Sequence, residues 1–166
     1  ARQDWKFKEI LRKLLRMKWL ECYNACGTKM KQQKVCKGGF DMRVVTTDKA
    51  PKALGPYSQG YVYNGMFYSA GQIPINPAND TVEASDIKGQ AEQVCKNLGA
   101  VLEAAGTSYE KVIKTTCFLA DMADFAAFNE VYAKYFTSKP ARSCVAVKTL
   151  PKNVLCEIEL IAVVED

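Results

Sequence analysis

The dipeptide Asn64-Gly65 is the strongest single constraint on the fold of this chain. It separates two short runs rich in aromatic and apolar residues, at 61–63 and 66–69. A two-residue Asn-Gly loop favours a tight hairpin, because its twist matches that of the two flanking strands. The sequence therefore predicts an antiparallel β-hairpin over residues 61–69.

Two amphipathic helices are predicted further along the chain. The first begins at Ser85 or Asp86, runs to Ala105 and is closed by Gly106. One apolar stripe runs along it, made of Ala91, Val94, Cys95, Leu98, Val101 and Leu102. The second covers residues 122–136, with its buried side formed by Phe125, Phe128, Val131, Tyr132 and Tyr135.

Four further apolar runs predict strands at residues 44–46, 112–119, 142–147 and 155–164. Residues 72–77 contain two prolines and cannot form a regular central strand, and residues 77–80 read as a turn. The order β-β-β-α-β-α-β-β predicts an α+β fold, a two-layer mixed β-sheet with two helices on one face. The other face would keep apolar residues exposed, so self-association is expected.

Charge divides the chain into two parts. Residues 1–41 carry 11 basic and 4 acidic residues, whereas residues 42–166 carry 12 basic and 14 acidic residues, a net charge of −2. We therefore expect a basic N-terminal extension at 1–41, with an amphipathic helix over 1–21 and then a linker, and one domain at 42–166. A basic, nucleic-acid-binding main domain is not supported.

Several explanations of residues 1–41 stay open. They are an extension added for expression, an over-long reading frame, a helix that packs on a neighbouring subunit, and a membrane-surface or organelle-targeting segment. Cys22, Cys26 and Cys36 could supply three ligands to a structural metal, but no fourth ligand stands nearby.

The chain contains no histidine, which excludes Ser-His-Asp and Cys-His catalysis and most catalytic zinc sites. Its seven cysteines are odd in number and irregularly spaced, so we expect reduced thiols in a cytoplasmic protein. No apolar run is long enough to span a membrane.

Seven segments of the chain carry a family resemblance and occur in a fixed order, at residues 53–59, 69–74, 97–106, 114–118, 128–132, 140–145 and 157–162. On these segments, residues 43–166 closely resemble the RidA/YjgF/UK114 family. The resemblance implies a chorismate-mutase-like (YjgF) fold and a homotrimer with a barrel-like centre. It also implies ligand sites between subunits and hydrolysis of 2-imino acids to 2-keto acids and ammonia without cofactor or metal.

Five residues are expected to bind the substrate: Arg142, Cys144 and Asn129, and in addition Gly71 and Ala70. The guanidinium of Arg142, in the segment Pro-Ala-Arg-Ser-Cys, can grip a carboxylate with two parallel hydrogen bonds. Cys144 has the same sheet-face parity, and the resemblance implies that it lines the site through its backbone, with some thiol reactivity but no covalent role. Asn129 matches a family position that supports the site by hydrogen bonds. The plainer alternatives are an interface ion pair, a buried cysteine and a surface amide.

Two residues are expected to be catalytic. Glu157 can position a water molecule or exchange a proton as the imine becomes an aminoalcohol. Glu159 has the same parity and competes with it, and the resemblance favours Glu157. Tyr57, after a proline turn, can present its hydroxyl at the rim of a cleft, unless it is an ordinary packed tyrosine.

The sequence departs from the family pattern at Ala70, where many members have a hydroxyl residue. Ser69 stands one place earlier, and a one-residue step on a strand reverses the side-chain face, so Ser69 cannot simply substitute. Gly71 could still offer its backbone to a ligand.

Two other functions remain as alternatives to imine hydrolysis. One is a trimeric ligand-binding or chaperone-like protein without turnover, which the change at Ala70 favours. The other is ribonuclease activity, which has been attached to relatives. The lack of histidine and the net −2 charge of the main domain oppose it.

Overall fold

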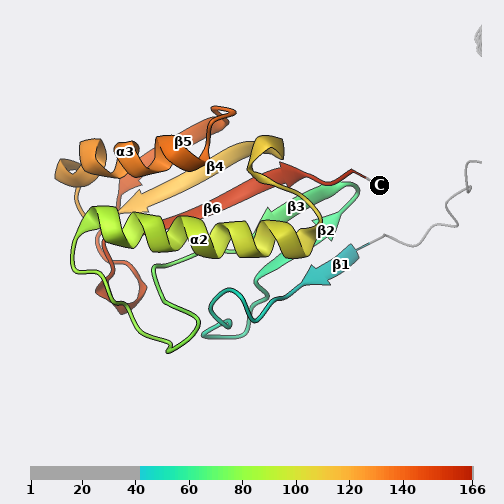
Figure 1. Cartoon of the computed structure of the whole chain (residues 1–166), viewed down its shortest axis with the longest axis horizontal. Coiled ribbons are helices and arrows are strands. Elements are labelled where there is room, and N and C mark those ends of the chain that lie inside the picture. The colour runs from blue at the N-terminus through green and yellow to red at the C-terminus, as the bar shows by residue number, and fades with distance from the viewer. Residues whose placement is uncertain (1–41, 166) are drawn as a thin grey trace, which may run out of the picture. The chain divides into compact units, whose positions relative to one another are not determined.

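The computed structural model describes residues 42–165 (Figure 1). The predicted helix, linker and cysteine trio of residues 1–41 lie outside the described residues. The elements are β1 (Met42–Val45), β2 (Gly60–Tyr63), β3 (Met66–Ser69), α2 (Ile87–Ala105), β4 (Val112–Leu119), α3 (Phe125–Tyr135), β5 (Ala141–Ala146) and β6 (Cys156–Val163).

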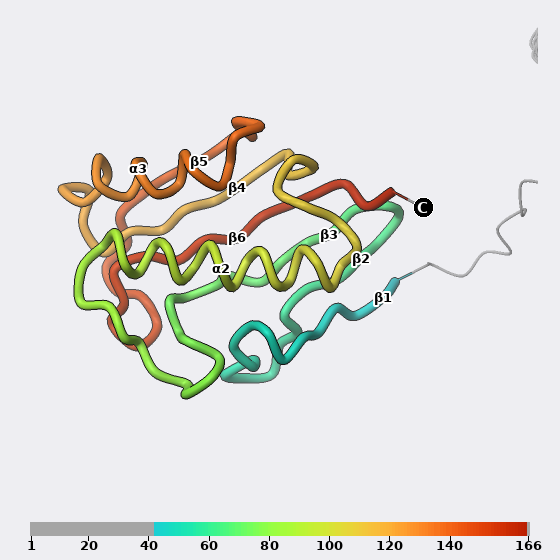
Figure 2. The backbone as a smooth tube through the Cα atoms, in the orientation of Figure 1, coloured from blue at the N-terminus to red at the C-terminus, as the bar shows by residue number. Residues whose placement is uncertain are grey.

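The strands form one mixed sheet, and both helices cover the same face of it. The strand order is β1-β2-β3-β6-β4-β5, and every pair is antiparallel except β4 with β5. Helix α2 crosses in front of the middle of the sheet, and α3 lies over its β4–β5 edge (Figures 1 and 2). The predicted two-layer α+β architecture is confirmed.

Local sequence signals set the ends of these elements. Asn64 and Gly65 both have positive φ, at 50° and 72°, as the tight turn between β2 and β3 requires. The Asp86 side chain accepts hydrogen bonds from the backbone N–H groups of Lys88 and Gly89 at the start of α2. Gly106, with a φ of 82°, ends the helix in the left-handed conformation.

The core lies between the helices and the sheet. The whole predicted stripe of α2 is buried, together with Phe67 of β3 and Ile158 of β6. Helix α3 begins later than predicted, because residues 122–124 form a separate 3-10 turn. Phe125 and Tyr135 are only partly buried, since α3 lies at the edge of the sheet.

The segment after β3 is irregular, as its prolines predict. Gln72 makes a single two-bond bridge with Ile158 of β6, with N···O distances of 2.8 and 3.1 Å. Residues 77–80 form a turn. This bridge brings the backbone of Gly71 beside the Glu157 side chain, and both residues line the pocket described below.

Within the described part of the chain, no helix has both the length and the apolar character needed to cross a bilayer.

Candidate functional site

A pocket of about 470 Å³ gathers four of the residues expected in the site. Tyr57 comes from the loop before β2, Ala70 and Gly71 from the segment after β3, and Glu157 from β6. The rest of the wall is mostly apolar and consists of Leu54, Gly55, Ile73 and Pro151. A small organic molecule placed here would meet one carboxylate and one phenol against an apolar wall.

The loop that carries Tyr57 is held by a buried glutamine. The Gln59 side chain accepts a hydrogen bond from the Thr47 N–H at 2.6 Å and donates to the Pro51 carbonyl at 2.8 Å. The Tyr57 hydroxyl accepts a hydrogen bond from the Leu54 N–H at 3.1 Å. The phenolic hydrogen therefore remains able to donate to a ligand.

Glu157 is the ionisable group of this pocket best suited to proton transfer. Partial burial raises the pKa of its carboxyl above the ordinary value, and the negative charge of Glu159 adds to this shift. A raised pKa brings the carboxyl closer to neutral pH, where an acid–base group exchanges protons most effectively.

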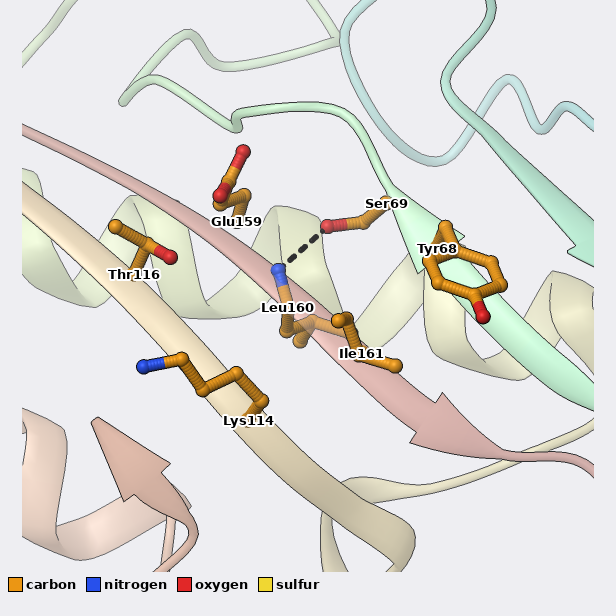
Figure 3. A pocket seen from close by; sticks show the side chains of 7 residues that line it. All are labelled: Tyr68, Ser69, Lys114, Thr116, Glu159, Leu160 and Ile161. Carbon is orange, nitrogen blue, oxygen red and sulfur yellow. Dashed lines mark hydrogen bonds between the residues drawn. The ribbon is translucent and has the colours of Figure 1, made fainter. Parts of the chain in front are cut away.

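Glu159, the competitor of Glu157, lies in a different pocket of about 140 Å³ (Figure 3). Its neighbours there include Lys114, Thr116 and Tyr68. Ser69 lines the same pocket, and its hydroxyl accepts a hydrogen bond from the Leu160 N–H at 2.9 Å. The Ser69 hydroxyl is thus used within the sheet, and it does not line the pocket around Glu157.

Arg142, Asn129 and an aromatic pair form a second cluster at the edge of the sheet. The guanidinium carbon of Arg142 lies 4.6 Å from the ring centre of Tyr132 and 5.5 Å from that of Phe125. Its Nη1 donates to Asn129 Oδ1 at 2.8 Å. The two cation–π contacts and this hydrogen bond hold the guanidinium in place, which favours its use as a fork for a carboxylate.

Cys144 belongs to the second cluster. It lies two residues beyond Arg142 on β5 and pairs in register with Cys117 of β4. Burial raises the pKa of the Cys144 thiol, while Arg142 opposes the shift. A largely protonated thiol is a poor nucleophile, so this environment favours a lining role and weakens the expected thiol reactivity.

The residues of the Glu157 pocket, here called the first cluster, and the second cluster around Arg142 lie on opposite faces of the sheet. Arg142 pairs with Thr115 of β4, which is fully buried and shares a hydrogen bond with Tyr132 of α3, so Arg142 faces the helices. Glu157 pairs with Phe118 of β4. Because successive residues of a strand alternate faces, Phe118 and Glu157 point away from the side of Thr115. Within one chain the two clusters are therefore separated by the sheet, so one small ligand cannot contact both.

Asn97 supports the first cluster, and sequence reasoning gave it no role. This residue of α2 is 1% exposed and donates from Nδ2 to the carbonyls of Ile73 and Ile75, at 3.0 and 2.9 Å. Its Oδ1 accepts from Gln93 at 2.8 Å. The sequence did contain one signal for this role, because Asn97 directly precedes Leu98 of the apolar stripe. An amide buried at such a position needs hydrogen-bond partners.

Asn97→Ala is expected to lower the free energy of unfolding by about 1–3 kcal/mol, because two carbonyls would lose their donor in the core. Urea denaturation of the variant and of the wild type measures this difference. Lys96→Ala, at the exposed neighbouring position of α2, is the control and should change stability by less than about 0.5 kcal/mol. Equal effects of the two substitutions would show that Asn97 does not brace this segment.

Within residues 42–165, no cluster of three or more histidine, cysteine, aspartate or glutamate residues could hold a metal ion. The four cysteines of this part, Cys95, Cys117, Cys144 and Cys156, are free thiols.

Comparison with known proteins gives consistent matches over the described domain. The profile of the family described as Endoribonuclease L-PSP matches residues 47–164. AldR of Lactococcus lactis, named as a regulator, is 50% identical over 125 residues, covering 75% of this chain and 99% of AldR. The 2-iminobutanoate/2-iminopropanoate deaminase of Escherichia coli is 46% identical over 125 residues, covering 73% of this chain and 97% of that protein. The crystal structure of E. coli TdcF with bound serine superposes with a TM-score of 0.71 at 42% identity, covering 74% of this chain and 99% of TdcF.

Proposed function

This chain belongs to the Endoribonuclease L-PSP family, to which the RidA/YjgF proteins belong, and on that premise we propose that it is a 2-imino acid deaminase. Its substrates would be 2-iminopropanoate and 2-iminobutanoate, and its products the 2-keto acids and ammonia. The observation that carries the proposal is the pocket that places the Glu157 carboxyl beside Tyr57, Ala70 and Gly71.

The chemistry needs one placed water molecule and one proton carrier. Glu157 takes a proton from the water as the water oxygen adds to the C=N carbon, and it passes this proton to the imine nitrogen, which gives a neutral aminoalcohol. In the second step Glu157 takes the hydroxyl proton of the aminoalcohol and passes it to the amine nitrogen, so that the C–N bond breaks, ammonia leaves and the C=O bond of the keto acid forms. The Tyr57 hydroxyl orients the water or the substrate. Because imines hydrolyse readily, positioning and proton transfer suffice for catalysis.

The carboxylate anchor would come from a second copy of the chain. Arg142 lies on the edge strand β5 and on the opposite face from Glu157 within one chain. A neighbouring subunit in a homotrimer can bring its own Arg142, with Asn129 and Cys144, to the mouth of the Glu157 pocket. The proposed site is therefore shared between subunits.

The exposed sheet face supports self-association. Three residues in register across β1, β2 and β3 lie on this face, namely Val44, Tyr61 and Tyr68, and they are 52%, 37% and 43% exposed. A row of exposed apolar and aromatic side chains on a sheet favours burial against another protein surface. We propose that this surface packs inside the trimer.

A second candidate function is binding of 2-keto or 2-imino acids without turnover. The observation that favours it is Ala70, which puts a methyl group in the pocket where the family resemblance leads us to expect a hydroxyl. Ribonuclease activity is less well supported, because the domain lacks histidine and carries a net charge of −2.

An assay with imines generated in place separates these functions. An amino acid oxidase produces 2-iminopropanoate from alanine, and the release of keto acid is followed with and without the protein. We expect acceleration by the wild type. Binding of pyruvate without acceleration would favour the binding function, and cleavage of RNA that survives Arg142→Ala would favour the ribonuclease.

A further inference from the structure

The Glu157 carboxylate occupies the space that a side chain at position 71 would need. A Cβ built on Gly71 would lie 1.8 Å from Glu157 Oε1 and 2.8 Å from Cδ, far inside van der Waals contact. The backbone of Gly71 does not itself demand glycine, because the glycines with positive φ in residues 42–165 are Gly65 and Gly106. Space, and not backbone conformation, therefore requires glycine at this position.

The backbone on both sides of Gly71 is held in place. The preceding residue, Ala70, donates its N–H to the Gln59 carbonyl at 2.9 Å. The following residue, Gln72, exchanges two backbone hydrogen bonds with Ile158. A larger residue at 71 would therefore displace the flexible end of the glutamate and not the segment that carries it.

We propose that Gly71 is a positioning residue: because it has no Cβ, the Glu157 carboxylate can pack directly against its Cα and is held at the pocket wall. We call this packing position the seat. This inference rests on the proposed function, in which Glu157 carries the proton. It gives Gly71 a steric task in addition to any contact of its backbone with a ligand. The partial burial of Glu157 is part of this arrangement, since the seat keeps the carboxylate away from open solvent.

The test compares Gly71→Ala with Gly99→Ala. Gly99 is the matched control, because a Cβ there would meet only Tyr109, at an ordinary 3.5 Å. Gly71→Ala is expected to lower kcat for imine hydrolysis by about 100-fold, close to the loss caused by Glu157→Gln. Adding Glu157→Gln to Gly71→Ala should cost less than about threefold more, because the two changes remove the same function. Gly99→Ala should keep wild-type kcat.

A titration makes the test independent of turnover. Carbon-13 NMR follows the carboxyl of Glu157, whose pKa should fall toward the ordinary glutamate value in Gly71→Ala as the group moves into water, away from Glu159. Gly99→Ala should leave it unchanged. An inactive wild type would refute the proposed function, while this titration would still decide the role of Gly71.

Three results would overturn the inference. They are a full kcat in Gly71→Ala, an additive loss with Glu157→Gln, or an unchanged Glu157 pKa. If Gly71→Ala unfolds, its combination with Glu157→Ala should restore the melting temperature, since the three atoms nearest to the new methyl group all belong to that side chain. A double variant that stays unfolded would place the conflict elsewhere and refute the seat.

Discussion

Arg142→Ala is expected to lower kcat/KM for 2-imino acids by at least about 100-fold, because a charged double hydrogen bond to the substrate carboxylate is lost. The rate of keto acid release at low substrate concentration measures this ratio. The fold should survive, since Arg142 is partly exposed and, within residues 42–165, its side chain donates a hydrogen bond to Asn129 alone. Thermal melting close to that of the wild type checks this.

Arg142→Lys separates geometry from charge. Lysine keeps the positive charge but cannot offer a planar fork or stack in the same way on Tyr132. We expect a loss of activity between those of the wild type and Arg142→Ala. Wild-type activity in Arg142→Ala would mean that Arg142 does not hold the substrate, whatever its neighbours.

Glu157→Gln is expected to lower kcat by about 100-fold with little change in KM, because glutamine keeps the shape of the side chain but cannot carry a proton. Steady-state kinetics with imine generated in place measures both constants. Glu159→Gln is the control. Glu159 lies in the neighbouring pocket, so the Glu159→Gln variant should retain kcat within about threefold of the wild-type value. The reverse ranking of the two variants would assign proton transfer to Glu159.

Glu157→Gln, which should lower activity, should raise the stability of the fold at neutral pH. The folded-state pKa of Glu157 is raised, so the folded protein holds more protons than the unfolded chain between the ordinary and the raised pKa. The contribution of Glu157 to stability therefore falls as pH rises through this window. Glu157→Gln, which has no charge to bury, should be more stable than the wild type at neutral pH. Urea denaturation at pH 4 and pH 7 tests this, and the gain should shrink at pH 4.

The sequence predicted the elements well wherever local chemistry decides them. Asn64-Gly65 set the hairpin, and Asp86 and Gly106 set the two ends of α2, because turns and caps depend on neighbouring residues alone. Parity along one strand placed Arg142 and Cys144 on one sheet face. The start of α3 was less accurate, since a 3-10 turn and a helix share similar local signals.

The relation between the two clusters could not be read from the sequence. Parity relates residues of one strand, whereas Arg142 and Glu157 lie on β5 and β6, whose relative faces depend on their register with β4 between them. Asn97 and Gln59 were missed as supports because the backbone groups that they bind are not their immediate neighbours in the sequence, lying 24 residues away for Asn97 and 8 for Gln59. Such contacts exist only once the strands and helices have packed.

The central claim is that Arg142 of one copy and Glu157 of another act on the same substrate. Co-expression of Arg142→Ala and Glu157→Gln chains with different tags, followed by purification on both tags, isolates mixed trimers. Each chain alone is expected to be inactive, but every mixed trimer would contain one intact site of three, so activity should return to about a third of the wild-type value. Mixed trimers as inactive as the two parents would contradict a site built from two subunits.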